Sequence, residues 1–247
     1  MKTKRFDKNN YEFNTKSKLG IYLIHGFTNT TYEVKELARF LANSGYHTIA
    51  NNLPGHGSSI DECNRIKYSD WINVVTKDIA ILASKSEKTY IIGCSMGAVL
   101  ALYVASRFPV NGCIVGGTVL KFRNHYAVNF LVPWICRFKK ILKKPTKLKS
   151  STKFYGYAGY PLRALNEFRK LNKVVRKKLG NITAPTLIIH SLSDGLSIKK
   201  NVDIVVDSIK SHNKEVLLVK KAHHNLFDTN PDQKLIFNEV LQFLNSN

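Results

Sequence analysis

Residues 90–98, Tyr-Ile-Ile-Gly-Cys-Ser-Met-Gly-Ala, are the stretch that decides the fold. A short apolar run leads directly into a glycine-x-serine-x-glycine sequence, and an apolar helical pattern over 98–108 follows it. A serine between two such glycines, placed between a predicted strand and a predicted helix, is typical of a nucleophile elbow. The turn strains the backbone of Ser95 and lifts its hydroxyl clear of the sheet edge, and only small residues at Gly93 and Gly97 leave room for that turn.

The rest of the chain alternates between short apolar runs and helical periodicities. Strands are predicted at 20–24, 47–50, 90–92, 110–115, 185–190 and 215–219, with helices at 31–44, 71–83, 98–108, 201–210 and 232–245. This alternation predicts an α/β fold with a mostly parallel sheet that helices cover on both faces. A chain of 247 residues suits one such domain with an insertion.

Composition excludes several other classes of protein. The chain is 44% hydrophobic, which is too much for a disordered protein, and no apolar stretch reaches the ~20 residues of a membrane span. Four cysteines without a CxxC pair predict neither a disulfide scaffold nor a zinc ribbon, so no metal or cofactor is expected. The polar, basic residues 1–18 lack the apolar segment of a secretory signal, which predicts a cytoplasmic location.

A serine hydroxyl is a poor nucleophile until a base takes its proton, and in this type of site an acid and then a histidine follow the serine along the chain. Asp194 lies just beyond the predicted strand 185–190 and is the candidate acid, which would orient the imidazole. His223 and His224 both lie just beyond the strand 215–219. Their adjacent side chains are not expected to face the same site, and chemistry alone leaves both open as the base.

A tetrahedral intermediate also needs hydrogen-bond donors for its oxyanion. In such elbows one donor is the N–H after the nucleophile, which here belongs to Met96. The other comes from the loop after the first main strand, where the Phe27 N–H is the candidate and Gly26 allows a close backbone approach. His25 and His56 also lie beside glycines, and they are interpreted as structural residues that fix their loops.

Together these residues resemble the α/β-hydrolase superfamily, and more narrowly the small bacterial carboxylesterases and monoacylglycerol lipases. The matching segments follow one another in order at 23–28, 53–57, 70–71, 93–97 and 184–186. The resemblance implies a serine hydrolase that cleaves small acyl esters, such as monoacylglycerols or lysophospholipids, through an acyl-enzyme. An acyl thioesterase is the nearest alternative.

The resemblance also assigns roles. It implies Ser95 as the nucleophile, Asp194 as the acid, and the two backbone amides named above as the oxyanion donors. In the family the base is commonly followed by an acid five residues later. Because Asp228 stands five residues after His223, the resemblance implies His223 as the base, with His224 as the alternative.

The basic residues are unevenly distributed along the chain. The segment 121–178 holds 17 of the 38 Lys and Arg residues but one acid, Glu167, and so accounts for most of the net charge of +21. The family resemblance implies a cap inserted at this place. The expected division is therefore an α/β-hydrolase core at 1–118 and 181–247, and a basic, aromatic, helical cap at 119–180.

The cap suggests two kinds of contact. Residues 133–142 predict an amphipathic helix, bounded by Pro133 and Pro145, whose apolar face carries Trp134, Ile135, Phe138, Ile141 and Leu142. In one interpretation this face lines the acyl pocket. In the other it dips into an anionic membrane whose head groups the basic residues of 121–178 meet, which would make the protein peripheral to the membrane. The two are compatible, because a lipid-ester substrate would enter through such a cap.

The charge alone would also suit a nucleic acid. No nucleic-acid-binding motif accompanies it, so no nucleic-acid partner is expected. The third alternative, an inactive hydrolase fold that serves as a binding module, is disfavoured by the complete Ser, Asp and His set. The sequence does not predict an oligomeric state.

Overall fold

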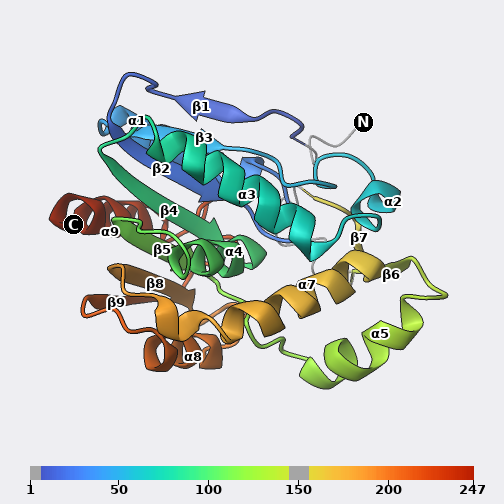
Figure 1. Ribbon diagram of the computed structural model, residues 1–247. Helices are drawn as coiled ribbons and strands as arrows, with labels where there is room; N and C mark the ends of the chain where they lie inside the picture. Colours follow the sequence, from blue (N-terminus) through green and yellow to red (C-terminus); the bar gives the residue numbers. More distant parts are fainter. Residues whose placement is uncertain (1–6, 145–155) are drawn as a thin grey trace.

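The computed structural model describes residues 7–144 and 156–247. Its centre is a seven-stranded sheet in the order β1-β3-β2-β4-β5-β8-β9, with helices on both faces (Figure 1). The strands are β1 Tyr11–Phe13, β2 Leu19–Ile24, β3 His47–Ala50, β4 Lys88–Cys94, β5 Gly112–Gly116, β8 Thr186–Ser191 and β9 Lys214–Val219. All neighbours pair in parallel except β1, which is antiparallel to β3. This confirms the predicted α/β fold with a mostly parallel sheet.

All six predicted strands are present, and β1 is an addition. It lies at the edge of the sheet, where Tyr11 pairs with Ala50 and Phe13 with Thr48. Its three residues are too few to show a periodicity in a polar segment, and only the pairing with β3 makes them a strand.

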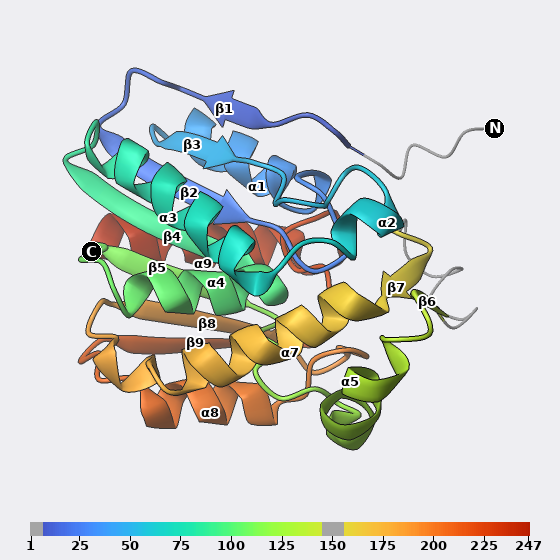
Figure 2. The same ribbon diagram turned by 45° about the vertical axis from the view of Figure 1, so that its right-hand side comes forward.

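Helices cover the sheet in two layers (Figure 2). The helices of the sheet domain are α1 Tyr32–Asn43, α2 Ile60–Cys63, α3 Tyr68–Ala83, α4 Met96–Ala105, α8 Lys200–Ser208 and α9 Gln233–Ser246. Residues of α1 and α9 share one buried apolar cluster, and residues of α3, α4 and α8 share another. The two clusters lie on opposite faces of the sheet, as expected for parallel strands buried on both sides.

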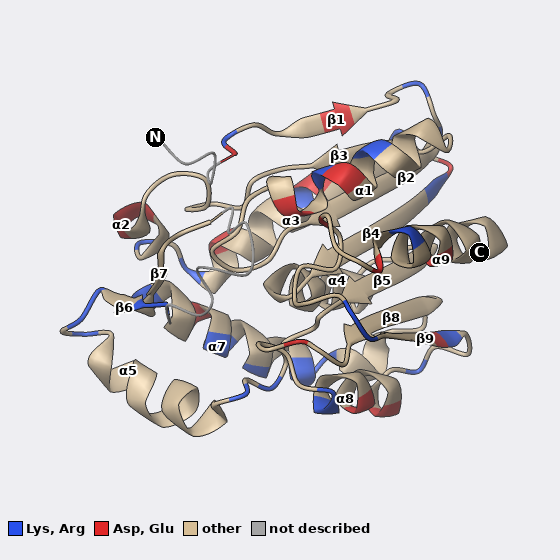
Figure 3. Cartoon of the chain, turned by 180° about the vertical axis from the view of Figure 1, so that it is seen from behind, with Lys and Arg blue, Asp and Glu red and all other residues tan. Residues whose placement is uncertain are grey.

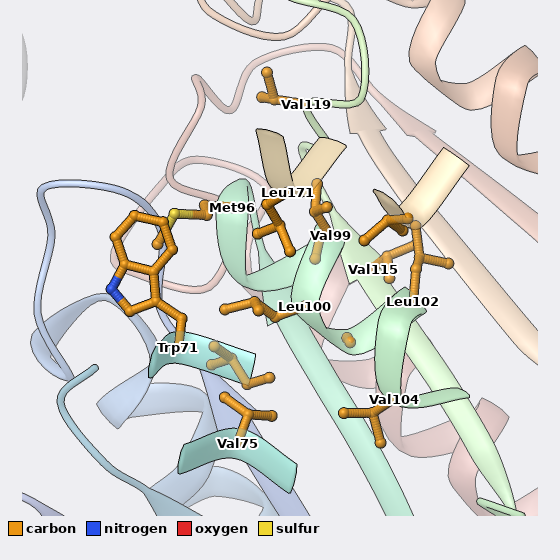
Figure 4. Close-up of a cluster of buried hydrophobic side chains, with 14 of the residues drawn as sticks. Trp71, Val75, Met96, Val99, Leu100, Leu102, Val104, Val115, Val119 and Leu171 are labelled. Carbon is orange, nitrogen blue, oxygen red and sulfur yellow. The ribbon is translucent and has the colours of Figure 1, made fainter. Parts of the chain in front are cut away.

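Helix α4 is the innermost of these helices. Nearly all of its residues are buried, and it is apolar all round because it lies between the sheet, α3 and the longer helix α7 Leu162–Arg176. Figure 4 shows Trp71 of α3 and Leu171 of α7 close to Met96 and Val99 of α4. The first turn of α4, which follows Ser95, is therefore held firmly from several sides.

The insert between β5 and β8 departs from the prediction. It contains the π-helical turn η1 Ala127–Leu131, α5 Val132–Ile135, a hairpin of β6 Ile141–Lys143 with β7 Gly159–Pro161, the helix α7, and the 3₁₀ turn η2 Leu179–Asn181. The helix predicted over 133–142 is wrong beyond Ile135, because residues 141–143 pair as a strand with β7. Tertiary pairing here overrides a helical pattern in the sequence. Pro145, the predicted limit of that helix, lies outside the described residues.

The part of the insert with α5, β6 and β7 lies at one end of the molecule and the last turn of α9 at the other, while α7 runs back from that part toward α8 (Figure 1). Within the described ranges, no helix combines the length and the apolar run that crossing a bilayer requires.

Candidate active site

Ser95 occupies a strained turn between β4 and α4. Its backbone adopts φ 56° and ψ −113°, a left-handed conformation that is rare for a residue with a side chain, and its N–H donates to Gly116 O at 2.8 Å. A Cβ on Gly93 would collide with the Gly97 carbonyl, and one on Gly97 would collide with the Ile24 carbonyl. The two glycines thus leave the space for the turn that the sequence motif predicts.

Asp194 and His224 form a hydrogen-bonded pair beyond the ends of β8 and β9. His224 Nδ1 donates to Asp194 Oδ2 at 2.8 Å, while Asp194 Oδ1 accepts the N–H groups of Leu196 and Ser197 at 2.7 and 2.9 Å. Burial by itself raises the pKa of Asp194, but the charge and hydrogen bond of His224 and the two amides outweigh burial and lower it. The carboxylate is therefore ionised and held in one orientation.

The choice of His223 from spacing is corrected by this geometry. The His223 side chain is exposed, and the histidine that reaches Asp194 is His224, the alternative left open above. Asp232 Oδ2 accepts the N–H groups of Lys221 and Ala222 at 2.7 and 2.8 Å, which fixes the backbone just before the two histidines. With that backbone fixed, consecutive side chains point in different directions, and only the second of the two points toward the acid.

The state of His224 follows from its surroundings. Burial lowers the pKa of His224, but the charge of Asp194 and the hydrogen bond to it raise the pKa above its usual 6.5. Nδ1 of the neutral ring keeps its proton and donates it in the hydrogen bond to Asp194, so Nε2 is free of hydrogen and can accept a proton. Ser95 and His224 line the same pocket, although their side chains are not hydrogen-bonded to each other.

The loop after β2 is fixed by a buried carboxylate that the sequence did not single out. Glu33, in the first turn of α1, accepts the Gly26 N–H at 2.5 Å and the Asn29 side-chain amide at 2.6 Å. A Cβ on Gly26 would lie 3.0 Å from the Ser95 Cβ, so this loop adjoins Ser95. Burial raises the pKa of Glu33. The sequence does not indicate this role, because an acidic residue near the start of a helix is usually exposed to solvent.

The two predicted oxyanion donors belong to segments that adjoin Ser95. Phe27 follows Gly26 and lines the pocket, and Met96 is the first residue of α4, where N–H groups have no partner within the helix. Within residues 7–144 and 156–247, neither amide donates a hydrogen bond. Both amides are thus available to an oxygen at the site.

His25 and His56 take structural positions. His25 Nε2 accepts the Leu53 N–H at 3.0 Å, and His56 Nδ1 lies 3.2 Å from Pro54 O. Burial lowers the pKa of His25 to about 4 and that of His56 to about 3, so both rings are neutral. They fix the loops on which they lie.

The insert supplies much of a pocket of about 310 Å³ over Ser95. Its apolar lining includes Val119, Phe122, Val128, Val132, Leu142, Leu165, Phe168 and Leu196. Trp134 and Phe138 are instead 67% and 89% exposed, and of the predicted apolar face only Leu142 lines the pocket. The expectation that this whole face lines the pocket is therefore wrong, because the helix ends early and its apolar side turns outward.

Comparison with known proteins places the chain in a family. The family model Hydrolase_4, described as serine aminopeptidase S33, matches residues 15–232. A thermostable monoacylglycerol lipase of Bacillus sp. (strain H-257) is 27% identical over 91% of this chain and 90% of its own, and a carboxylesterase of Bacillus subtilis (strain 168) is 22% identical over 91% of each. The structure of a metagenome-derived lipolytic enzyme superposes with a TM-score of 0.87 at 24% identity, covering 97% of this chain and 98% of that one, which shows the shared fold. The chain therefore belongs to the Hydrolase_4 family of α/β-hydrolases, as the resemblance in its sequence indicates.

Proposed function

We propose that the protein is a serine ester hydrolase of the monoacylglycerol lipase and carboxylesterase type, with Ser95, His224 and Asp194 as its catalytic triad. The observation that carries this proposal is the hydrogen bond from His224 Nδ1 to Asp194 Oδ2, at a pocket whose lining includes the strained Ser95. Relatives of this chain that bear the names monoacylglycerol lipase and carboxylesterase support the choice of ester over other substrates.

The proposed reaction proceeds in two halves. Ser95 Oγ attacks the ester carbonyl carbon while its proton passes to His224 Nε2, and the N–H groups of Phe27 and Met96 stabilise the oxyanion. The intermediate then collapses, and the leaving alcohol takes the proton from the imidazolium. Water attacks the resulting acyl-enzyme with the same base, which releases the acid and restores Ser95. Asp194 keeps the imidazole oriented and stabilises its positive charge.

The lining of the pocket favours binding of the substrate's acyl chain, the part of the ester that is released as the carboxylic acid. Its lining is predominantly apolar, with Phe168 packed at 5.7 Å from Phe27 and 5.1 Å from Phe122 between ring centroids. Burial of each methylene in such a lining contributes about 0.8 kcal/mol. We therefore expect residues 119–180 to act as the cap that selects the acyl group.

A fluorophosphonate probe tests the nucleophile directly. We expect it to label the protein at Ser95, and we expect nitrophenyl esters to be turned over faster as the acyl chain lengthens until the pocket is filled. The variant S95A is the control for both measurements. Labelling that persists in S95A, or no turnover of any ester, would contradict the proposal, and faster cleavage of a matched acyl thioester would favour a thioesterase.

We also propose that the insert docks on anionic membrane surfaces, from the cytoplasmic side. An exposed set of large apolar side chains, which we call the aromatic patch, consists of Tyr126, Phe130, Leu131, Trp134 and Phe138. Arg137 lies over the Trp134 ring at 5.2 Å, and blue Lys and Arg segments flank the largely tan α5 in Figure 3. Apolar side chains ringed by cations are typical of interfacial binding to anionic lipid.

Vesicle binding tests this surface. We expect the protein to bind vesicles that contain anionic lipid, to bind neutral ones less, and to lose about tenfold in affinity when salt screens the charges. The double variant W134A/F138A should weaken binding further, because it removes apolar area from the boundary. I81A is the matched control, since Ile81 is an exposed apolar residue on α3, in the sheet domain. Equal binding of anionic and neutral vesicles, or equal effects of the two variants, would refute docking.

A further inference from the structure

A buried lysine lies in the same pocket as the nucleophile. Lys144, directly after β6, is 5% exposed and lines the pocket together with Ser95 and Phe27. Its Nζ donates to Thr28 Oγ1 at 2.7 Å and lies 5.1 Å from the centroid of the Tyr160 ring. Lysines are almost never buried to this extent in proteins, because removing the ammonium group from water is costly.

The position of this lysine relates it to the reacting carbonyl. Thr28 follows Phe27, the proposed oxyanion donor, and has a left-handed backbone with φ 66°. The Thr28 carbonyl accepts the Tyr157 N–H at 2.9 Å, so a residue of the insert helps to fix this loop. Lys144 is therefore anchored at the oxyanion loop, and it brings a cationic group into a pocket whose lining is otherwise largely apolar.

Two basic side chains, Lys144 and Arg123, line the pocket. The Arg123 guanidinium donates to Asp194 O at 3.0 Å. Burial lowers the pKa of Lys144 to about 7, and the nearby Glu33 opposes this shift. A bound anion would favour the ammonium form, so such a substrate gains a charge-assisted hydrogen bond on entering.

We propose that Lys144 determines the head-group specificity of this site by binding an anionic substituent, a phosphate or a carboxylate, on the alcohol part of the ester. The inference rests on the proposed ester hydrolysis and narrows its substrates from neutral glycerol esters to esters such as an acylglycerol phosphate. Lys144 contacts the substrate and does not take part in proton transfer.

Matched esters test the proposal. The probes are a monoacylglycerol and the 1-acylglycerol 3-phosphate with the same short acyl chain, both below their micellar concentrations. We expect K144M to lower the ratio of kcat/KM for the phosphate ester over that for the neutral ester by about tenfold or more. K144R should preserve most of the ratio, because it keeps the charge. K140M is the matched control, because Lys140 is exposed and pairs with Asp61 at 3.2 Å, and it should leave the ratio unchanged.

Two outcomes overturn the proposal. Both leave the ratio of the two kcat/KM values unchanged. One is an equal loss of kcat/KM for both esters in K144M, which would mean that Lys144 only packs the pocket, and the other is a kcat/KM that K144M changes for neither ester. An acyl ester of glycerate, measured beside the phosphate ester, distinguishes carboxylate from phosphate recognition.

Binding separates this inference from the proposed reaction. Calorimetry on S95A, with and without K144M, measures affinity for the two esters without any turnover. If no ester is cleaved but the phosphate ester binds S95A about tenfold more tightly than S95A/K144M, the hydrolase proposal fails and the role of Lys144 stands. If the esters are cleaved but binding of the phosphate ester is independent of Lys144, the hydrolase proposal stands and the proposed role of Lys144 fails.

Discussion

Ester hydrolysis by H224A is expected to fall by about four orders of magnitude or more in kcat, whereas H223A should stay within about threefold of the parent protein. The two residues are neighbours of the same chemical type, but only the His224 ring is hydrogen-bonded to Asp194. In the proposed mechanism, the Ser95 hydroxyl has no base to take its proton without that ring. Turnover of a nitrophenyl ester by the two purified variants measures the difference.

The pH profile provides the control for this pair. A base must be neutral to accept a proton, so activity should rise with pH through the pKa of His224, which Asp194 holds above its usual 6.5. D194N should move this midpoint to lower pH and reduce kcat by about four orders of magnitude, since the amide no longer stabilises the correct tautomer. A large loss in H223A with normal activity in H224A would refute the assignment.

Replacing Ser95 should separate catalysis from stability. We expect both S95A and S95G to lose about four orders of magnitude or more in kcat, because neither has a nucleophile. S95G should also be more stable than S95A by about 1 kcal/mol, because glycine adopts the left-handed φ of 56° without strain. Urea unfolding of the two variants, followed by circular dichroism, measures this difference.

The comparison between S95G and S95A isolates the effect of the backbone conformation on the free energy of unfolding, since both variants lack the hydroxyl. Equal free energies of unfolding would show that the turn is not strained. Residual activity in S95A above that of the uncatalysed reaction is expected, because the Phe27 and Met96 amides remain in place.

The sheet could be predicted from the sequence because its signals are local. Each parallel strand is a short apolar run next to a helical periodicity, and the elbow has its own sequence pattern around Ser95. The hairpin of β6 and β7 could not be predicted, since residues 141–143 become a strand only through pairing with 159–161. The burial of Glu33 and Lys144 could not be predicted either, because in the sequence each is one charged residue among many.

The error over the histidine has a specific cause. Asp228 stands five residues after His223, and the spacing seen in relatives therefore favoured that residue. In the structure Asp228 is buried and accepts the N–H of Thr229 at 2.7 Å, while Asp232 fixes the start of the loop. Which of two adjacent histidines faces the acid depends on these loop hydrogen bonds, and a spacing rule does not record them.

The placement of the last turn of α9 has a practical consequence. Helix α9 ends at Ser246, on the side of the molecule away from α5 and the β6–β7 hairpin (Figure 1), and Lys88 Nζ donates to the carbonyl of the next residue, Asn247, at 2.9 Å. A fluorophore or a solid support attached at this turn of α9 is therefore held away from α5 and the β6–β7 hairpin. Such a conjugate should suit flow reactors and oriented biosensor chips, where a label placed on the insert would obstruct entry.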